Sequence, residues 1–330
     1  MELAQIFSNN MVLQAEKPVR FFGEGKGKIA ITLNNQRYEQ TFISDEWVME
    51  LPAQPYGKPL NITVDLNGKK RVFENVAFGD VFLCAGQSNM QYTIAEERGA
   101  NPIKTDERIR YFYVEKAEKI KAENSTYEWL TCENGAALNW SALGTHIAQY
   151  YREKRDVYVG IIGCFQGASA ICSWLPPRTL DESVFVPFEQ RHDDNRHEIY
   201  GVWNGDSYLY SQLFSRIVPY GIKSVFWYQG ESNTTLAESK VYTQLLRNLI
   251  KAWREDLKDF ELPFIIVEIC DFDGRNDEAW RAIQKCQQEV AKLEKNVKTV
   301  TSKDVCDHSN IHPANKEKLA KKIVSVLCED

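Results

Sequence analysis

The sequence predicts an α/β protein in which a doubly wound, parallel sheet follows a smaller all-β unit. From residue 78 onward, short apolar runs alternate with stretches of helical periodicity, a pattern typical of a parallel sheet with helices on both faces. Residues 1–77 instead contain short β-branched or alternating runs separated by turn residues. We therefore expect a β-sandwich accessory domain over residues 1–77 and an α/β catalytic domain over residues 78–330.

The expected elements follow from these patterns. In the N-terminal unit, strands are expected at 11–14, 19–22, 28–33, 48–51, 62–66 and 71–73. In the second domain, strands are expected at 81–85, 109–114, 157–163, 223–228, 264–269 and 297–301, and helices at 141–154, 207–218, 238–257, 278–294 and from 315. Residues 174–206 combine polar, aromatic and proline residues, which indicates a long loop over a site.

Composition narrows the classes of function. The chain has 330 residues and a net charge of −6, which gives no electrostatic case for binding nucleic acid or an anionic membrane. The N-terminal residues lack the pattern of a secretory signal, and no segment approaches the roughly 20 apolar residues of a membrane span. Eight scattered cysteines without a Cys-x-x-Cys pair are expected to be reduced thiols, so we expect a cytoplasmic protein. The sequence leaves the oligomeric state open.

One strand has the features of a nucleophile turn. Residues 81–85 are apolar without alternation, as expected for a central strand covered on both faces. Gly86 permits a sharp turn after the strand, and Ser88 then stands where a helix can begin. The free N–H groups of that first helical turn would point toward the serine. A polar residue in an ordinary strand–helix turn would look the same, so the interpretation depends on other positions.

Further chemistry-bearing residues follow other strand ends in the same domain. They are Gly167 after strand 157–163; Gln229, Glu231 and Asn233 after strand 223–228; and His312, followed by Pro313, after strand 297–301. A serine is a weak nucleophile at neutral pH and needs an adjacent base, a role that histidine can fill. A tetrahedral intermediate also needs preorganised donors, such as a backbone N–H or a side-chain amide. Together these residues predict acyl transfer.

A metal site and an organic cofactor are not expected. Only His308 and His312 form a close histidine pair, and they lie before a proline in a predicted loop rather than on one face of a helix. The serine-based set needs neither a metal nor a cofactor.

Three blocks of the sequence resemble a known family. Residues 85–90 (Ala-Gly-Gln-Ser-Asn-Met), 227–233 (Trp-Tyr-Gln-Gly-Glu-Ser-Asn) and 311–313 (Ile-His-Pro) are similar to signature blocks of the sialate O-acetylesterase family, in the SGNH hydrolase superfamily. The resemblance covers nearly the whole chain, including an N-terminal β-domain. It implies an SGNH-hydrolase-like (flavodoxin-like) core with a five-stranded parallel sheet flanked by helices.

The resemblance also implies residue roles. Ser88 corresponds to the nucleophile and His312 to the general base. The backbone N–H groups of Ser88 and Gly167 and the side chain of Gln229 would form the oxyanion hole, with Asn233 as an alternative donor. Glu231 would support the site without reacting, and it is the sixth residue of the predicted active-site set.

The acidic member of the triad departs from the family pattern. The family usually carries an aspartate two or three residues before this histidine, where the chain has Asn310 and Ser309. Asp307 reaches His312 if the residues between them form a compact turn, and we favour it slightly. The alternatives are Asp304, or a Ser88–His312 dyad with a main-chain acceptor.

The predicted function is that of a serine esterase that removes O-acetyl groups from a sugar, with O-acetylated sialic acid as the favoured substrate. Two alternatives remain open. One is an esterase for acetylated xylan fragments or another acetyl-sugar, because fold and triad do not fix the substrate. The other is a carbohydrate-binding homologue with weakened catalysis, which Ser309 and Asn310 suggest.

Overall fold

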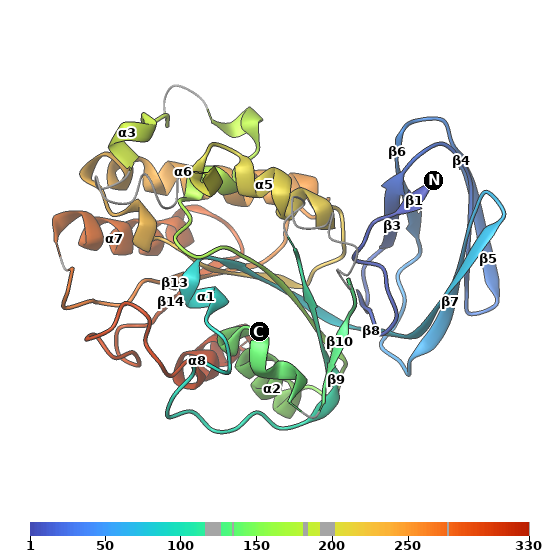
Figure 1. Cartoon of the computed structure of the whole chain (residues 1–330), viewed down its shortest axis with the longest axis horizontal. Coiled ribbons are helices and arrows are strands. Elements are labelled where there is room, and N and C mark those ends of the chain that lie inside the picture. The colour runs from blue at the N-terminus through green and yellow to red at the C-terminus, as the bar shows by residue number, and fades with distance from the viewer. Residues whose placement is uncertain (116–126, 134, 181–183, 192–201, 276, 330) are drawn as a thin grey trace.

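A computed structural model describes residues 1–115, 127–133, 135–180, 184–191, 202–275 and 277–329. The molecule has a larger body, in which helices lie on both sides of a sheet, and a smaller part of strands that carries the N-terminus (Figure 1). One strand, β8 (Lys69–Gly86), belongs to both parts. Its first half pairs with β7 (Leu60–Leu66), and its second half pairs with β11 (Val159–Phe165) and β12 (Ser224–Tyr228). The expected boundary at residue 77 therefore falls inside a continuous strand.

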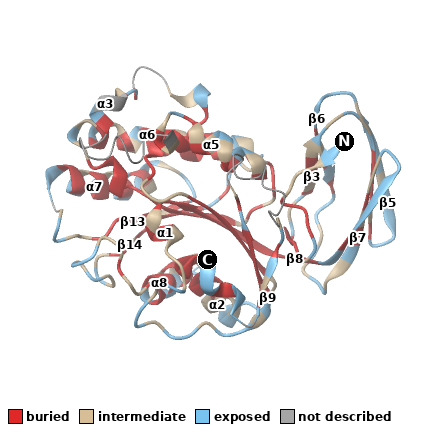
Figure 2. Ribbon diagram, viewed as in Figure 1, coloured by how far each residue is buried: buried red, intermediate tan, exposed pale blue. Residues whose placement is uncertain are grey.

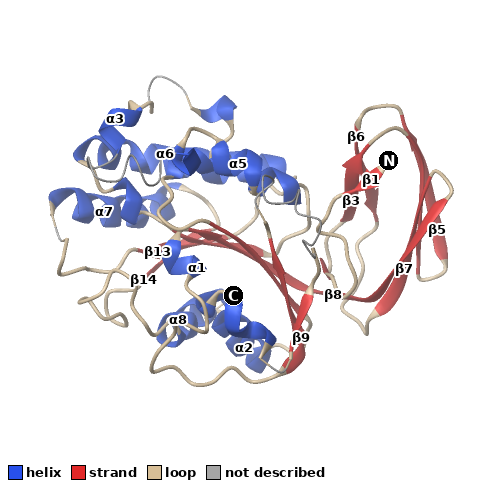
Figure 3. Ribbon diagram, in the orientation of Figure 1, coloured by secondary structure: helices blue, strands red, loops and turns tan. Residues whose placement is uncertain are grey.

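The smaller part consists mainly of antiparallel strands, without helices in residues 1–77 (Figure 3). β3 (Val19–Glu24) pairs with β1 (Glu2–Leu3) and β6 (Glu46–Leu51). In a second group, β4 (Gly27–Leu33) pairs with β5 (Gln36–Phe42) and β7. The short β2 (Val12–Gln14) instead runs parallel to β8. The pattern missed β5 because this edge strand is polar and mostly exposed, so burial leaves no hydrophobic alternation in its sequence.

The larger sheet has the strand order β10-β9-β11-β8-β12-β13-β14, with β9 at Asp106–Tyr113, β10 at Leu130–Cys132, β13 at Phe264–Glu268 and β14 at Val297–Thr301. All neighbours from β9 to β14 are parallel, and β10 is an antiparallel edge strand. Within the described residues this gives six parallel strands, so the five implied by the family resemblance are too few. These six correspond to the strands expected from the sequence, and they include β9, whose residues 109–112 are buried where it pairs with β11.

Helices cover both faces of the sheet. α2 (Ala142–Lys154) and α8 (Glu317–Leu327) pack together on one face, and α6 (Leu236–Asp256) and α7 (Glu278–Leu293) on the other (Figure 1). The central strands are consequently buried throughout, which Figure 2 shows in red. This two-sided burial explains why their sequences are continuous apolar runs.

The remaining helices are short. The α-helices are α1 (Ser88–Gln91), α3 (Phe188–Arg191) and α5 (Tyr208–Gln212), and the 3₁₀ turns are η2 (Ala136–Asn139), η3 (Ile171–Trp174), η4 (Pro177–Thr179), η5 (Val202–Asn204), η6 (Phe214–Ile217) and η7 (Glu231–Asn233). The single helix expected at 207–218 is wrong. Leu213, with φ −127° and ψ −69°, interrupts it between α5 and η6. The expected loop at 174–206 contains short helical turns in its described part, and residues 181–183 and 192–201 lie outside the described residues.

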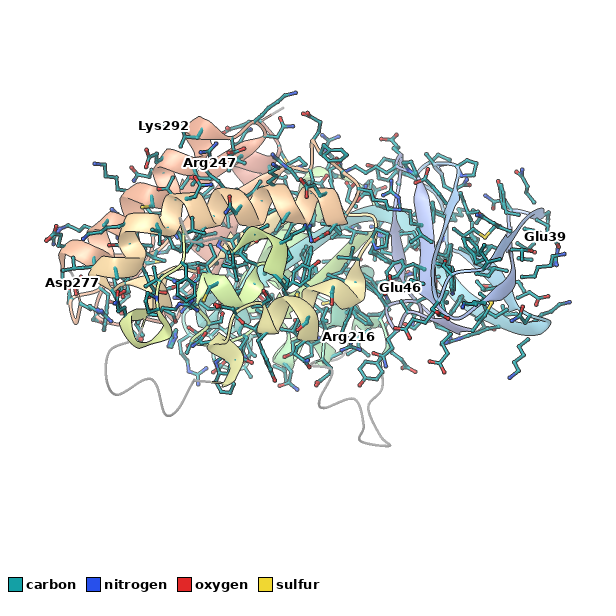
Figure 4. All side chains as sticks on the ribbon, turned by 90° about the horizontal axis from the view of Figure 1, so that it is seen from above. Glu39, Glu46, Arg216, Arg247, Asp277 and Lys292 are labelled. Carbon is teal, nitrogen blue, oxygen red and sulfur yellow. The ribbon has the colours of Figure 1, made fainter. Side chains whose placement is uncertain are left out.

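Side-chain contacts join the two parts. Figure 4 shows Arg216 on the larger body, and Glu39 and Glu46 on the smaller part. The Arg216 guanidinium donates hydrogen bonds to the Gln5 side chain and to the Glu115 carbonyl. Lys17 makes an ion pair with Asp259, 2.6 Å away, which is a second link between the parts. These contacts fix the N-terminal unit to the larger body.

Candidate active site

The turn after β8 requires a glycine and exposes a serine. Gly86 has a φ of +134°, and a Cβ built on it would lie 2.1 Å from the Tyr228 carbonyl oxygen. The next residue, Gln87, donates its N–H to the same carbonyl at 2.9 Å. Ser88 is then the first residue of α1 and remains partly exposed at the carboxyl edge of the sheet. At the first turn of a helix, N–H groups have no intrahelical acceptor and are available to a bound anion.

Ser88 lies in hydrogen-bond contact with His312. The distance between Ser88 Oγ and His312 Nε2 is 2.8 Å. Burial and the positive charge of Lys316 lower the pKa of His312 from its ordinary 6.5, and Glu96 opposes this effect. The imidazole is therefore neutral at physiological pH and can accept the hydroxyl proton.

The carboxylates near the histidine loop have other partners. Asp307 is exposed and accepts the N–H of Ser309 at 2.9 Å, a bond that lowers the pKa of its carboxyl. Asp304 pairs with Lys322 at 2.6 Å. Asn310 accepts the main-chain N–H of His312 at 2.8 Å.

Within the described residues, the hydrogen bonds of His312 therefore reach Ser88 and Asn310 but neither aspartate. The structure thus brings the predicted nucleophile and base together without the predicted Asp307 contact. The carboxylate whose charge acts on the His312 ring is Glu96, from the segment after α1, which sequence reasoning missed. Its side chain also accepts hydrogen bonds from the N–H and Oγ1 of Thr93.

Gly167 lies beside the nucleophile, as expected from its place after β11. A Cβ built on it would be 3.7 Å from Ser88 Cβ. Its N–H donates to the side-chain oxygen of Gln91, 2.7 Å away. Sequence reasoning missed Gln91, whose amide gave no distinguishing signal within a short helix.

Gln229 and Asn233 are buried behind the site, and their amides hydrogen-bond to other protein groups. Gln229 donates from Nε2 to the Ser169 carbonyl at 2.8 Å and to Asn233 Oδ1 at 2.6 Å, while its Oε1 accepts from Tyr242 at 2.9 Å. Asn233 Oδ1 also accepts the Ile171 N–H. Both side chains have 0% exposure, so in this arrangement they brace the loops that surround the nucleophile.

Asn233 is held in the same way on its donor side, where Nδ2 donates to Glu238 Oε1 at 2.7 Å. Glu231 is buried as well, and its Oε1 accepts a hydrogen bond from Asn89 Nδ2 at 2.6 Å. The amide of Asn89 also bonds to Lys316, which lies just before α8. Neither Asn89 nor Lys316 was singled out, because an amide and a lysine near helix starts are ordinary features of surface segments.

Metal and membrane features are absent from the described part of the chain. No group of three or more His, Cys, Asp or Glu side chains there is arranged to hold a metal ion. His308, the neighbour of His312 in the sequence pattern, bonds through Nε2 to the Lys303 carbonyl at 2.7 Å. No described helix combines the length and apolar character that crossing a membrane requires.

Comparison with known proteins identifies the family. A family model for a carbohydrate esterase, sialic acid-specific acetylesterase, matches residues 78–325. Human sialate O-acetylesterase is 23% identical, over 97% of this chain and 69% of that protein. The mouse sialate O-acetylesterase is 24% identical, over 97% and 71%. The crystal structure of a carbohydrate acetylesterase from Xanthomonas citri superposes with a TM-score of 0.80 at 25% identity, covering 97% of this chain and 72% of that one. The protein is thus a carboxylic ester hydrolase and belongs to the family of sialic acid-specific acetylesterases among the carbohydrate esterases.

Proposed function

We propose that the protein hydrolyses O-acetyl esters of sugars with Ser88 as the nucleophile, and that O-acetylated sialic acid is its substrate. The observation that carries the mechanism is the 2.8 Å contact between Ser88 Oγ and His312 Nε2 at the carboxyl edge of a parallel sheet. The choice of sialic acid is supported by the family model and by the activity named for the human and mouse relatives.

The chemistry proceeds in two halves. His312 Nε2 takes the Ser88 hydroxyl proton while Oγ attacks the acetyl carbonyl carbon, and the C=O electron pair moves to the oxygen. When the tetrahedral intermediate collapses, the sugar oxygen leaves and takes the proton from His312. Water then attacks the acetyl-serine while His312 takes its proton, and the second intermediate collapses to acetic acid as the histidine returns that proton to Ser88 Oγ.

The developing oxyanion needs donors that face it in the intermediate. We assign the N–H of Ser88, at the start of α1, and the N–H of Gly167 to this role. Gln91 Oε1 occupies the Gly167 N–H in the free protein, so the acetyl oxygen takes the place of that amide oxygen. Gln229, Asn233 and Glu231 support the loops from behind rather than contacting the oxyanion.

The base works as a Ser88–His312 dyad assisted by the negative charge of Glu96. Asp307 and Asp304 make other contacts, which are the Ser309 N–H and the Lys322 ammonium. A carboxylate near the imidazole favours the imidazolium that forms in the transition state.

For the rest of the chain, we propose an SGNH-type α/β catalytic domain over residues 78–330, preceded by a β-sandwich accessory domain over residues 1–77. The family model begins at residue 78, in keeping with this division. The cytoplasmic location stays a prediction from the sequence.

A second substrate class has specific support. The Xanthomonas citri relative, at 25% identity, is described as a carbohydrate acetylesterase without mention of sialic acid. An acetylated xylan fragment or another acetyl-sugar is therefore the alternative substrate.

The deciding experiment measures acetate release from O-acetylated sialic acids, acetylated xylo-oligosaccharides and p-nitrophenyl acetate. A kcat/KM for the sialic acid ester at least about tenfold above that for the xylan fragments supports the proposal. The reverse order makes the enzyme a general acetyl-sugar esterase. Absence of turnover with all three esters contradicts the proposed activity.

A further inference from the structure

Lys316 is a buried cation that the mechanism above does not use. The side chain has 0% exposure. Its Nζ donates a hydrogen bond to Asn89 Oδ1 at 2.6 Å and lies 4.9 Å from the ring centre of Tyr92 and 5.9 Å from that of Tyr228. Lysine is rarely buried without an ion-pair partner, because removing an ammonium group from water is costly. Within the described residues, no carboxylate forms an ion pair with its Nζ, and the ammonium contacts the amide oxygen of Asn89 and the two aromatic rings instead.

The amide of Asn89 connects this ammonium to both halves of the catalytic pair. Asn89 follows Ser88 in the chain, and its Nδ2 donates to the carbonyl of Ile311, at 2.9 Å, immediately before His312. A hydrogen bond between the neighbours of Ser88 and His312 sets how far apart the two functional groups lie.

The orientation of that amide is determined by charge. Lys316 requires an acceptor, so Asn89 Oδ1 faces the ammonium, while Nδ2 faces the Ile311 carbonyl and Glu231 Oε1. Rotating the amide by half a turn would direct its N–H groups at the ammonium and its oxygen at two acceptors. Both changes are repulsive, so the ammonium holds Asn89 in the orientation that bonds to Ile311.

We propose that Lys316 is a positioning residue for the Ser88–His312 pair, acting through the amide of Asn89 and through its own positive charge. This inference rests on the proposed function, because it assigns a role within the same site. Lys316 does not contact the acetyl group in this assignment.

The charge acts on the base directly. Lys316 lowers the pKa of His312, in addition to burial, whereas Glu96 on the segment after α1 raises it. Lys316 therefore favours the neutral imidazole in the resting enzyme. A resting base that stays neutral at lower pH extends activity toward acid pH.

The ammonium itself titrates within an accessible range. Burial lowers the pKa of Lys316 to about 8, and the groups that oppose this effect are Cys306, Glu231, Glu97 and Cys270, from the loops after β14, β12, α1 and β13. Above that pH the ammonium loses its proton, and its hold on Asn89 weakens. The wild-type enzyme should then lose kcat on the alkaline side of pH 8.

The primary test replaces Lys316 with methionine, which keeps the length of the side chain but removes its charge and its donor. We expect Lys316→Met to lower kcat by about tenfold with KM changed by less than about twofold. The alkaline limb of the kcat profile should disappear, and the acid limb should move to higher pH. Lys318→Met is the matched control, because Lys318 is exposed two residues further along the chain and should leave kcat and both limbs unchanged.

A second pair of variants decides the case if Lys316→Met does not fold. Asn89→Asp keeps the acceptor for Lys316 but removes the donor to Ile311 and faces Glu231 with a second carboxylate. We expect Asn89→Asp to lower kcat by about tenfold or more. Adding Glu231→Gln to this variant should recover part of the lost kcat, because the new amide at position 231 supplies a donor to residue 89.

The outcomes separate the inference from the proposed function. A folded Lys316→Met protein with wild-type kcat and an unchanged pH profile overturns the inference alone. If Lys316→Met does not fold, the inference is also overturned when the Asn89→Asp/Glu231→Gln protein regains none of the kcat that Asn89→Asp loses. A wild-type protein that hydrolyses no acetyl ester and whose Ser88 does not react with a fluorophosphonate overturns the proposed function, and the inference with it.

Discussion

Ser88 Oγ and His312 Nε2 lie 2.8 Å apart although 224 positions separate the two residues in the chain. The serine follows the central strand β8, and the histidine belongs to the loop between β14 and α8. The parallel order of the strands places both loops at the same edge of the sheet, where open α/β sheets bind ligands.

This contact predicts that Ser88→Ala abolishes hydrolysis. Without the hydroxyl no acyl-enzyme forms, so kcat for a sugar acetate should fall by roughly 10⁴-fold or more. Acetate release measures the loss, and thermal unfolding should show a Tm near that of the wild type, because Ser88 is only partly buried. Ser211→Ala, which changes an exposed serine on α5, is the control. Retention of a tenth of the activity in Ser88→Ala would contradict the assignment.

The contacts of Asp307 lead to a different expectation for the acidic residue. Its carboxylate accepts the Ser309 N–H and does not bond to His312, so Asp307→Asn should lower kcat by less than about tenfold. Glu96→Gln should lower kcat more than Asp307→Asn does, because it removes the negative charge that favours the imidazolium. Steady-state kinetics of the two variants at one pH compare them directly. A loss of 10²-fold or more in Asp307→Asn alone would restore the triad with Asp307.

Most of the fold was predictable from the sequence, and each element that was missed or predicted wrongly has a local cause. Central strands such as β11 and β12 are buried on both faces, so their sequences are almost entirely apolar and easily recognised. The edge strand β5 buries little, so no alternation marks it. The helix expected at 207–218 has a suitable apolar pattern, but the backbone at Leu213 departs from helical geometry. Periodicity does not encode such a break.

The candidate site was predictable where a residue follows a strand end directly, and less so elsewhere. Ser88 and Gly167 lie together because β8 and β11 are neighbouring parallel strands. Gln229 also follows a strand, yet its side chain turns inward to Ser169 and Tyr242. The side of a loop toward which an amide points depends on tertiary partners, which a single sequence does not contain. The partner of Lys316 was hidden for the same reason.

The hydrogen bond between Gly167 and Gln91 predicts an effect on substrate binding. Gln91 Oε1 holds the N–H that we assign to the oxyanion, so the substrate must displace it. Gln91→Ala removes this competitor and should lower KM by about threefold at a similar kcat. Initial rates over a range of acetyl ester concentrations separate the two parameters. A decrease in kcat of more than about tenfold would mean instead that Gln91 supports the reaction itself.

The N-terminal unit should contribute to stability rather than to chemistry, and Trp47 on β6 tests this expectation. Its side chain is buried, its Nε1 donates to the Glu24 carbonyl at 3.2 Å, and its ring lies 5.9 Å from that of Phe42. Trp47→Ala leaves a cavity and an unpaired carbonyl, which together should lower the free energy of unfolding by ~3 kcal/mol. Trp47→Phe keeps most of the ring volume and should cost less. Urea unfolding measures both losses, and kcat at a temperature where each variant is folded should match the wild type. A large fall in kcat with an unchanged free energy of unfolding would place this unit at the active site, because burial of Trp47 could not account for it.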